Sequence, residues 1–498
     1  MLLGDQTLSS TEPRSLAAPA LAIGLALALV AAAILVAPVS TAALVGIGLG
    51  LVALAGYATV RWPRAIIVVV VLAPILDRYI VSGLLPPEVV QLAQFLSEGL
   101  LLVVGVTLAV RAWRSGTLAP ALRHPVTYLL GAFVVLGAVS ALLNGVPPHV
   151  AAIGLLFTLD AAVLFFLPRF VGFGRRQQVR AVAAVLVVIG AAAVVVLVQA
   201  VLSPDILGLR FVTGRFGEGY RLAGFIGDPN VFGAFAAAAS PFVLLAIPRS
   251  SGRLRWIAVA AAFLLLLALW LSFSRGAWLA MAIGTLGTLL LIDRRALLIA
   301  LLLLVATFVS SQVMPRNLLL PTADGGPERP SLIESTVDRA GTVGQGRDLR
   351  TLFVLNAIPI VVDHPLLGVG PGRFGGAVAD RFPTPVYAEY GTDALLTDET
   401  QRTVDNFWLH LLVEAGALGL AAFLAAMLSA AIPMLRTARR STGARAVLVG
   451  GALAAVAALS VSGVSTMLLE ANSVGFLVWF LLGLGSLMVV DEAIEAPA

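Results

Sequence analysis

Continuous runs of apolar residues, separated by short polar segments, recur along the whole chain. A run of about 20 apolar residues is long enough for a helix to cross the hydrocarbon core of a bilayer. The runs lack the strict alternation of membrane β-strands, so they predict helices. The pattern predicts about fourteen spans, at residues 16–37, 39–59, 65–82, 90–110, 125–143, 150–170, 178–202, 230–248, 256–272, 276–292, 296–313, 406–434, 444–466 and 473–490.

The composition supports this fold class and narrows the chemistry. The chain is 59% apolar and 12% charged, whereas soluble domains carry about 25% charge. We therefore expect an all-α, polytopic membrane helix bundle with no nucleic-acid partner. The absence of cysteine excludes disulfides and thiolate chemistry. The four histidines are scattered, without zinc-ligand spacing, so we expect neither a metal nor a cofactor.

The distribution of arginine predicts the orientation of the helices. Every basic residue is an arginine, and short clusters lie between the predicted spans at 61–64, 111–123, 175–180, 249–255, 294–295 and 436–445. With a cytoplasmic N-terminus, the positive-inside rule assigns all these clusters to the inner side. Both termini are then cytoplasmic. Residues 1–15 are mostly polar and precede an apolar run that is longer than a signal-peptide core, which predicts a tail rather than a cleaved signal.

Two polar segments fall on the outer side in this topology. The first, 203–229, carries Arg210, Arg215 and Arg221, and the second, 314–405, is a large loop between the eleventh and twelfth spans. The loop predicts a short helix at 348–362, packed on the bundle or the membrane surface, followed by Gly/Pro turns in "HPLLGVGPGRF". Ordered loops of this length are usually functional. His364, in the turn region, is either structural or catalytic.

Arg275 is the single charge in the apolar stretch "LLLLALWLSFSRGAWLAMAIG". At a helix centre it would cost about 2.5–3.5 kcal/mol. Arginine clusters hold both ends of the 256–292 hairpin inside, so the turn containing Arg275 is expected at the outer face. Either Arg275 snorkels there, or it joins Arg221 around one diphosphate. The second alternative predicts guanidiniums within about 10 Å of each other.

The segment "RFGEGYRLAGFIGDPNVFGAF" precedes and opens the eighth predicted span. Asp228 suits a helix N-cap, Pro229 the first helical position, and Asn230 starts the span. Capping alone would explain these residues. It does not explain arginines on the outer side, which together with the helix N-terminus would suit a phosphate.

The segment "DNFWLHLLVEAGALG" opens the twelfth predicted span. Asp405 either caps this helix or serves as a general base on a sugar hydroxyl, with Asn406 beside it. Glu414 lies deeper in the apolar run, where a carboxylate needs a partner and is a functional candidate. His410, one turn into the helix, is a weaker candidate.

In this order, the segments "RLAGFIGDPNVFGAF", "SFSRGAWLA", "HPLLGVGPGRF" and "DNFWLHLLVEAGALG" resemble the O-antigen ligase and polymerase superfamily. The resemblance covers about residues 200–435. It divides the chain into a cytoplasmic tail (1–15), an N-terminal transmembrane bundle (16–202), a ligase-like core (203–435, including the loop 314–405), and a C-terminal hairpin with a tail (436–498). Members are membrane glycosyltransferases that act on polyprenyl-diphosphate-linked glycans.

The resemblance implies roles for individual residues. Arg221 and Arg275 correspond to the arginines that bind the carrier diphosphate, with Arg210 and Arg215 on the same side. The ligase branch has a sequence motif in which a histidine is followed by Asn, Ser or Gln, then by nine residues of any type, and then by Gly-x-x-Gly. Asn406, Gly416 and Gly419 fit this frame, but Asp405 stands at the histidine position. This departure weakens a ligase assignment and favours the polymerase branch or another branch. The catalytic candidates are Asp405 and His364, and the supporting candidates are Asp228, Asn230, Asn406 and Glu414.

We therefore expect an inverting, metal-independent polymerase in the bacterial plasma membrane, with its active site at the outer face. Its partners would be a polyprenyl-diphosphate-linked glycan donor, a glycan acceptor and the bilayer, with a flippase and a chain-length regulator as candidates. Three alternatives stay open: a ligase that transfers finished glycan to a lipid, wall or protein acceptor; a polysaccharide or lipid transporter; and an inactive scaffold. No internal repeat or midplane charge pattern, the usual marks of transporters, is evident.

Overall fold

The computed structural model describes residues 41–84, 96–202, 221–313, 349–382, 384–391, 404–470 and 472–495. All regular structure in these ranges is helical. The predicted span at 16–37 and the candidates Arg210 and Arg215 lie outside the described residues.

The N-terminal part of the described chain is a group of helices. They are α2 (Thr41–Arg61), α3 (Pro63–Leu84), α5 (Leu96–Arg114), α6 (Leu118–Leu122), α7 (Pro125–Leu143), α8 (Pro148–Leu159), α9 (Val163–Phe170) and α10 (Arg175–Val201). The predicted span at 150–170 is one rod in which a 3₁₀ turn, η1 (Asp160–Ala162), separates α8 from α9.

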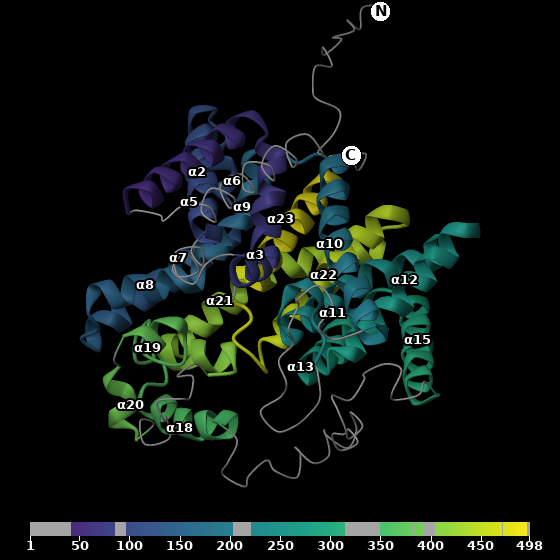
Figure 1. The fold of residues 1–498 in the computed structure, drawn as a ribbon. Helices are drawn as coiled ribbons and strands as arrows, with labels where there is room; N and C mark the ends of the chain where they lie inside the picture. The colour runs from purple at the N-terminus through teal and green to yellow at the C-terminus, as the bar shows by residue number, and fades with distance from the viewer. Residues whose placement is uncertain are drawn as a thin grey trace, which may run out of the picture.

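The remaining helices build the core and the outer lobe. They are η3 (Gly224–Ile226), α11 (Pro229–Ala246), η4 (Ile247–Arg249), α12 (Gly252–Leu271), α13 (Arg275–Leu279), the π-helical segment η5 (Ala280–Leu286), α14 (Gly287–Ile292), α15 (Arg294–Val313), α18 (Leu349–Asp363), α19 (Ala377–Arg381), α20 (Pro385–Glu389), α21 (Phe407–Arg440), α22 (Gly443–Ser462) and α23 (Asn472–Glu495). In Figure 1, α18, α19 and α20 form a lobe at the lower end of the molecule.

The prediction of a polytopic helix bundle is confirmed. Nine helices in the described ranges are long and apolar enough to cross a membrane, and each coincides with a predicted span. Helices α2, α3, α15 and α23 also fall on predicted spans. The total of about fourteen spans stays a prediction. The predicted loop helix is confirmed as α18, which packs against α21 and leaves Val354, Leu355, Ile358 and Val362 exposed.

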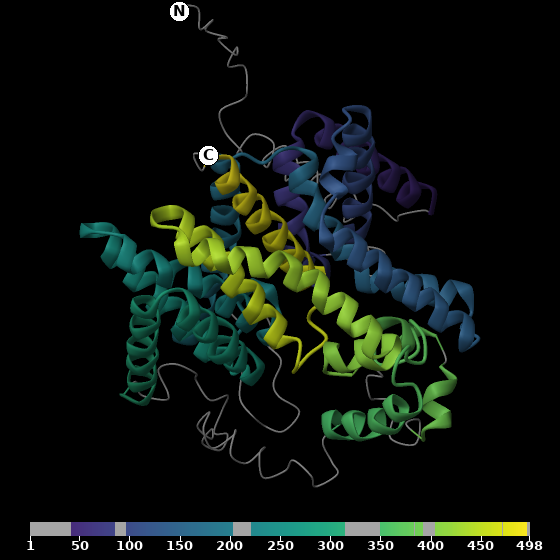
Figure 2. The ribbon, with the colours of Figure 1, turned by 180° about the vertical axis from the view of Figure 1, so that it is seen from behind.

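Helices α11, α21, α22 and α23 form the centre of the bundle, between α7–α9 on one side and α10, α12 and α15 on the other (Figures 1 and 2). Small residues allow the close packing of α11 with its neighbours, because alanine and glycine let helix backbones approach each other. A side chain at Gly451 of α22 would collide with the ring of Phe242 of α11. The candidate site is therefore built on the most enclosed helices of the bundle.

Polar contacts join the helix ends that carry the arginine clusters. Arg249 forms an ion pair with Asp293 at 2.6 Å, and Arg439 Nε donates to the carbonyl oxygen of Leu291 at 2.7 Å. Arg445 donates to the carbonyl oxygen of Met488. These contacts pair ends that the arginine pattern assigns to one side of the membrane. The motifs around Arg221, Arg275 and Asp405 lie at the opposite ends of α11, of the α13–α14 span and of α21.

Candidate functional site

Arg221 is fixed against the start of α11 and the turn that follows α12. Its Nη2 donates to Asn230 Oδ1 at 2.7 Å, and its Nε donates to the carbonyl oxygen of Ser272 at 3.2 Å. Ser274 Oγ donates to the same Asn230 oxygen at 3.0 Å. Asn230 therefore links Arg221 to the turn directly before Arg275. We call Arg221, Asn230, Ser272 and Ser274 the arginine network.

The start of α11 has the predicted cap. Asp228 Oδ1 accepts the backbone N–H groups of Asn230 at 2.8 Å and Val231 at 3.2 Å, and Pro229 is the first helical residue. This confirms the capping role of Asp228. The cap also fixes the backbone of Asn230 and so the direction of its side chain, which connects the capping residues to the arginine network.

The turn between α12 and α13 is tight. Phe273 has a left-handed backbone conformation (φ 48°), which is uncommon for a residue other than glycine. Ser274 caps α13 by accepting the Ala277 N–H at 3.3 Å. A Cβ atom at Gly233 of α11 would lie 2.9 Å from Ser272 Oγ, so α11 packs directly on the turn. The first residue of α13 is Arg275, half-buried at the edge of this arrangement.

The end of α22 lies between the Arg275 turn and the start of α21. A Cβ atom at Gly276 would lie 3.1 Å from the Cβ of Ser465. The backbone N–H of Phe407 donates to the carbonyl oxygen of Gly463 at 2.9 Å. The starts of α13 and α21, which carry Arg275 and Asp405 in or beside their first turn, therefore both contact the end of α22 at one end of the bundle.

Asp405 does not cap α21. The cap is Asn406, whose Oδ1 accepts the Leu409 N–H at 3.0 Å. The capping alternative for Asp405 is therefore wrong. Asp405 lies one position before the cap, and its side chain is half-buried.

Helix α21 is broken at Gly416. The Gly/Pro segment of the loop forms hydrogen bonds with the backbone groups that the break leaves without helical partners. Gly416 has φ 66° and ψ −176° inside the helix, a conformation that is essentially restricted to glycine. Four backbone hydrogen bonds join the segment to the helix across the break: Val369 N to Val413 O, Gly370 N to Glu414 O, Ala417 N to Pro365 O and Leu418 N to Leu366 O, all at 2.9–3.1 Å. Backbone groups freed in a membrane helix need such partners.

Helices α7 and α8 hold the other side of the same segment. Ser140 Oγ and Asn144 Nδ2 of the α7 end donate to the carbonyl oxygen of Gly368 at 3.2 and 3.1 Å. A Cβ atom at Gly154 of α8 would lie 2.6 Å from the backbone nitrogen of Gly372. The segment 364–376 is thus fixed between α7, α8 and α21 rather than lying on the surface.

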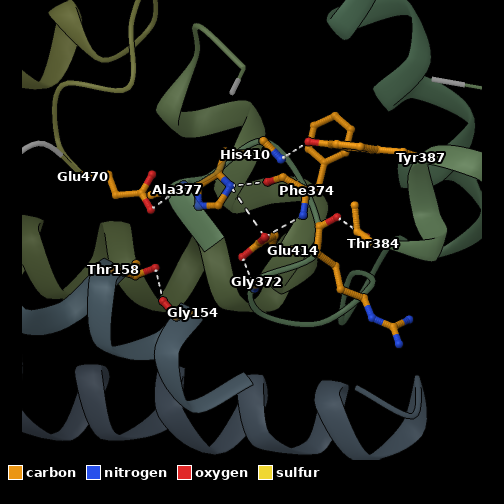
Figure 3. A network of polar contacts seen from close by, with 12 residues as sticks. Gly154, Thr158, Gly372, Phe374, Ala377, Thr384, Tyr387, His410, Glu414 and Glu470 are labelled. Atoms are coloured by element: carbon orange, nitrogen blue, oxygen red, sulfur yellow. Dashed lines mark hydrogen bonds and ion pairs between the residues drawn. The ribbon is translucent and has the colours of Figure 1, made fainter. Parts of the chain in front are cut away.

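Glu414 has the partner that its burial requires. Its carboxylate accepts the backbone N–H of Gly372 at 2.8 Å and that of Phe374 at 2.7 Å, and it lies 3.8 Å from His410 Nδ1. Figure 3 shows the carboxylate below the His410 ring, with the loop wrapped around it. Glu414 therefore holds the loop onto α21, and its role in the structure is to position other groups.

Replacing Glu414 with Gln should destabilise the protein by about 1–3 kcal/mol, because an amide NH₂ would face a backbone N–H and leave a buried donor unsatisfied. The measurement is the melting temperature of the purified protein in detergent. The control is Glu389→Gln, which changes an exposed carboxylate on α20. Equal melting temperatures for both variants would contradict the assignment of Glu414 to loop anchoring.

Residues 260–424 match the model of a protein family described as O-Antigen ligase. The match supports membership of the O-antigen ligase and polymerase superfamily. The match lies within the 200–435 predicted from the motifs and runs from the interior of α12 to the interior of α21. No curated protein matches the chain.

The O-antigen ligase match contains Arg275, the loop segment 364–376, and the Asp405–Gly419 motif. Arg221 precedes the matched residues, and the structure joins it to them through Ser272 and Ser274. Together with the nine apolar helices of the described part of the chain, the match supports a multi-pass membrane enzyme of the O-antigen ligase and polymerase type.

His364 directly follows the C-terminal end of α18. Its backbone carbonyl accepts the Gly368 N–H at 3.1 Å, and its own N–H donates to Ile360 O at 2.9 Å. These contacts start the turn that leads to the α21 break. They involve only the backbone, so the structural and catalytic alternatives for the His364 side chain both stay predictions.

Arg373, in the "GPGRF" part of the ligase-type loop, reaches back to α7. Its Nη2 donates to the carbonyl oxygen of Gly145 at 3.3 Å. Burial lowers the pKa of the Arg373 guanidinium, and nearby Glu389 partly opposes this shift. Arg373 thus contributes to fixing the loop between α7 and α20.

Sequence reasoning missed Glu470 as a site residue. Glu470 Oε1 accepts the backbone N–H of Ala377 at 3.2 Å, which ties the α22–α23 turn to the start of α19. A signal existed, because Glu470 is the single charged residue between Arg445 and Asp491. Among the described residues, no three His, Cys, Asp or Glu side chains are arranged to hold a metal ion.

Proposed function

We propose that this enzyme polymerises a cell-surface polysaccharide by joining glycan repeat units that are linked to a polyprenyl diphosphate. The observation that carries the proposal is the arginine network, which fixes Arg221 beside the turn that leads into Arg275. In the proposed complex both guanidiniums contact the diphosphate of the donor. Arginine suits this role because its planar fork matches phosphate oxygens bidentately.

The proposed reaction is a single displacement with inversion. An acceptor hydroxyl oxygen attacks the anomeric carbon of the donor, and the bond from that carbon to the phosphate oxygen breaks. The polyprenyl diphosphate leaves with the electron pair, and the two arginines stabilise its charge. The hydroxyl proton passes to a carboxylate. Asp405 is the candidate that the superfamily pattern offers, and this chemistry needs neither metal nor cofactor.

The proposed active site faces outward. The arginine-rich helix ends fit the cytoplasmic side under the positive-inside rule. The ends that carry Arg221, Arg275 and Asp405 lie opposite. Arg210 and Arg215 are proposed to add positive charge on that side. A flippase would supply the donor from the inner leaflet, and a chain-length regulator would act on the growing polymer.

Deletion of the gene followed by mass spectrometry of lipid-linked glycans tests the polymerase proposal. We expect single repeat units on the carrier, because a polymerase consumes them. Finished polymer retained on the carrier would instead favour the ligase alternative. Repeat units confined to the inner leaflet would favour a transporter, and an unchanged glycan profile would contradict all three functions. Complementation with the intact gene is the control.

A further inference from the structure

Glu470 is a partly exposed carboxylate at the end of the bundle where the candidate site lies. It follows α22, in the turn whose Ser465 lies beside Gly276, the residue after Arg275. Its Oε1 is fixed by the backbone N–H of Ala377 at 3.2 Å. Because one carboxylate oxygen is anchored and the side chain is partly exposed, the other oxygen can form a hydrogen bond with a substrate hydroxyl.

His410 lies behind Glu470 and is only 2% exposed. Its Nδ1 hydrogen-bonds the carbonyl oxygen of Phe374. A carbonyl oxygen can only accept, so Nδ1 carries the hydrogen and Nε2 is the nitrogen free to gain or lose a proton. Within the described part of the chain, no residue forms a hydrogen bond with this Nε2.

The ring of His410 and the carboxylate of Glu470 face each other across Gly376. A Cβ atom at Gly376 would lie 2.7 Å from His410 Cε1 and 3.1 and 3.3 Å from the two carboxylate oxygens of Glu470. Figure 3 shows the edge of the ring opposite Phe374 turned towards Glu470. Only a residue without a side chain fits between the two groups.

The hydrogen bond between Nδ1 and the carbonyl oxygen of Phe374 orients the His410 ring. Glu414 lies 3.8 Å from the same Nδ1 and is itself held by two loop N–H groups. The three side chains Glu414, His410 and Glu470 thus lie in this order from the buried part of α21 to the partly exposed turn after α22. A buried group oriented by supporting hydrogen bonds is the usual way to fix a reacting group.

We propose that Glu470 is the general base that takes the proton from the acceptor hydroxyl, with His410 as a positioning residue behind it. This assignment rests on the proposed function. As the acceptor oxygen forms its bond to the anomeric carbon, its proton moves to the free Glu470 oxygen, and the diphosphate leaves with the electrons of the broken bond. Glu470 then returns the proton to water. Asp405 would lie beside the acceptor without accepting its proton.

Three ionisable groups interact electrostatically with Glu470. They are His410 and Glu414 of α21 and Asp160 of η1.

The test compares Glu470→Gln, Asp405→Asn, His410→Asn and the control Glu389→Gln in purified protein. Gln keeps an oxygen for the Ala377 N–H but cannot accept a proton. The probe is the lipid-linked glycan extracted from the deletion strain, with the kcat and KM of glycan transfer measured and binding measured with undecaprenyl diphosphate. We expect Glu470→Gln to lose about 100-fold or more of the transfer rate and to keep binding the carrier.

His410→Asn should retain measurable transfer, with a lower kcat per folded molecule and an unchanged KM for the lipid-linked donor, which a merely structural role would not produce. Transfer by Glu470→Gln at more than half the wild-type rate would overturn the assignment, as would loss of both transfer and carrier binding. A 100-fold loss confined to Asp405→Asn would assign the base to Asp405 instead. If the wild-type protein itself transfers no glycan, the proposed function is refuted. The wild-type measurement therefore separates failure of the proposed function from failure of the Glu470 assignment.

Discussion

Replacing Arg221 with Ala should lower glycan transfer by about 100-fold to 1,000-fold, the range found when one preorganised donor to a developing negative charge is removed. Arg221 is held by Asn230 and by the Ser272 carbonyl, so its guanidinium is oriented before a donor arrives. The variant should also bind the carrier more weakly. The measurements are polymer length in cells and transfer by the purified protein, together with binding of undecaprenyl diphosphate.

Arg221→Lys separates charge from geometry. Lysine keeps the positive charge but cannot form the forked contacts of a guanidinium, so we expect it to recover only a small part of the lost activity. Arg253→Ala is the matched control, because Arg253 is exposed at the opposite end of the same helical core. Polymer of normal length made by Arg221→Ala would contradict the proposed diphosphate site.

Replacing Gly416 with Ala should destabilise the protein by about 2–5 kcal/mol. The backbone conformation at Gly416 (φ 66°, ψ −176°) is unfavourable for any residue with a side chain. The new Cβ would also collide with the backbone of Leu366 and Leu367. The variant should accumulate poorly in membranes and melt at a lower temperature in detergent, and the displaced loop should abolish transfer.

Gly131→Ala is the control for that substitution. Gly131 lies in α7, and a Cβ atom there would meet no atom within 4 Å. Alanine is favoured over glycine inside a helix, so this variant should melt at or slightly above the wild-type temperature. A Gly416→Ala protein with unchanged stability and activity would show that the break in α21 does not need glycine.

Features that depend on neighbouring residues could be predicted from the sequence. Hydropathy located the spans because a membrane helix must be apolar along its whole length, and the nine helices that qualify all fall on predicted spans. The cap at Asp228 and the loop helix α18 were predicted correctly for the same reason, since capping and amphipathic patterns extend over only a few residues.

The predictions at α21 were less successful. Asp405 and Asn406 are both suitable N-cap residues, and only the backbone geometry decides that Asn406 is the cap. The sequence marked Glu414 as a buried carboxylate in need of a partner. It did not identify the partner, which is the backbone of a loop about 40 residues away.

The sequence by itself predicted a polytopic helical membrane protein that resembles the O-antigen ligase family, and it located the candidate arginines and most of the candidate carboxylates. Only the tertiary structure decided which of them meet. Arg221 reaches Ser272 across 51 residues, and Glu470 reaches Ala377 across 93. Such pairs depend on how helices rotate and pack against one another. Hydropathy cannot encode this, because many rotations bury the same apolar area.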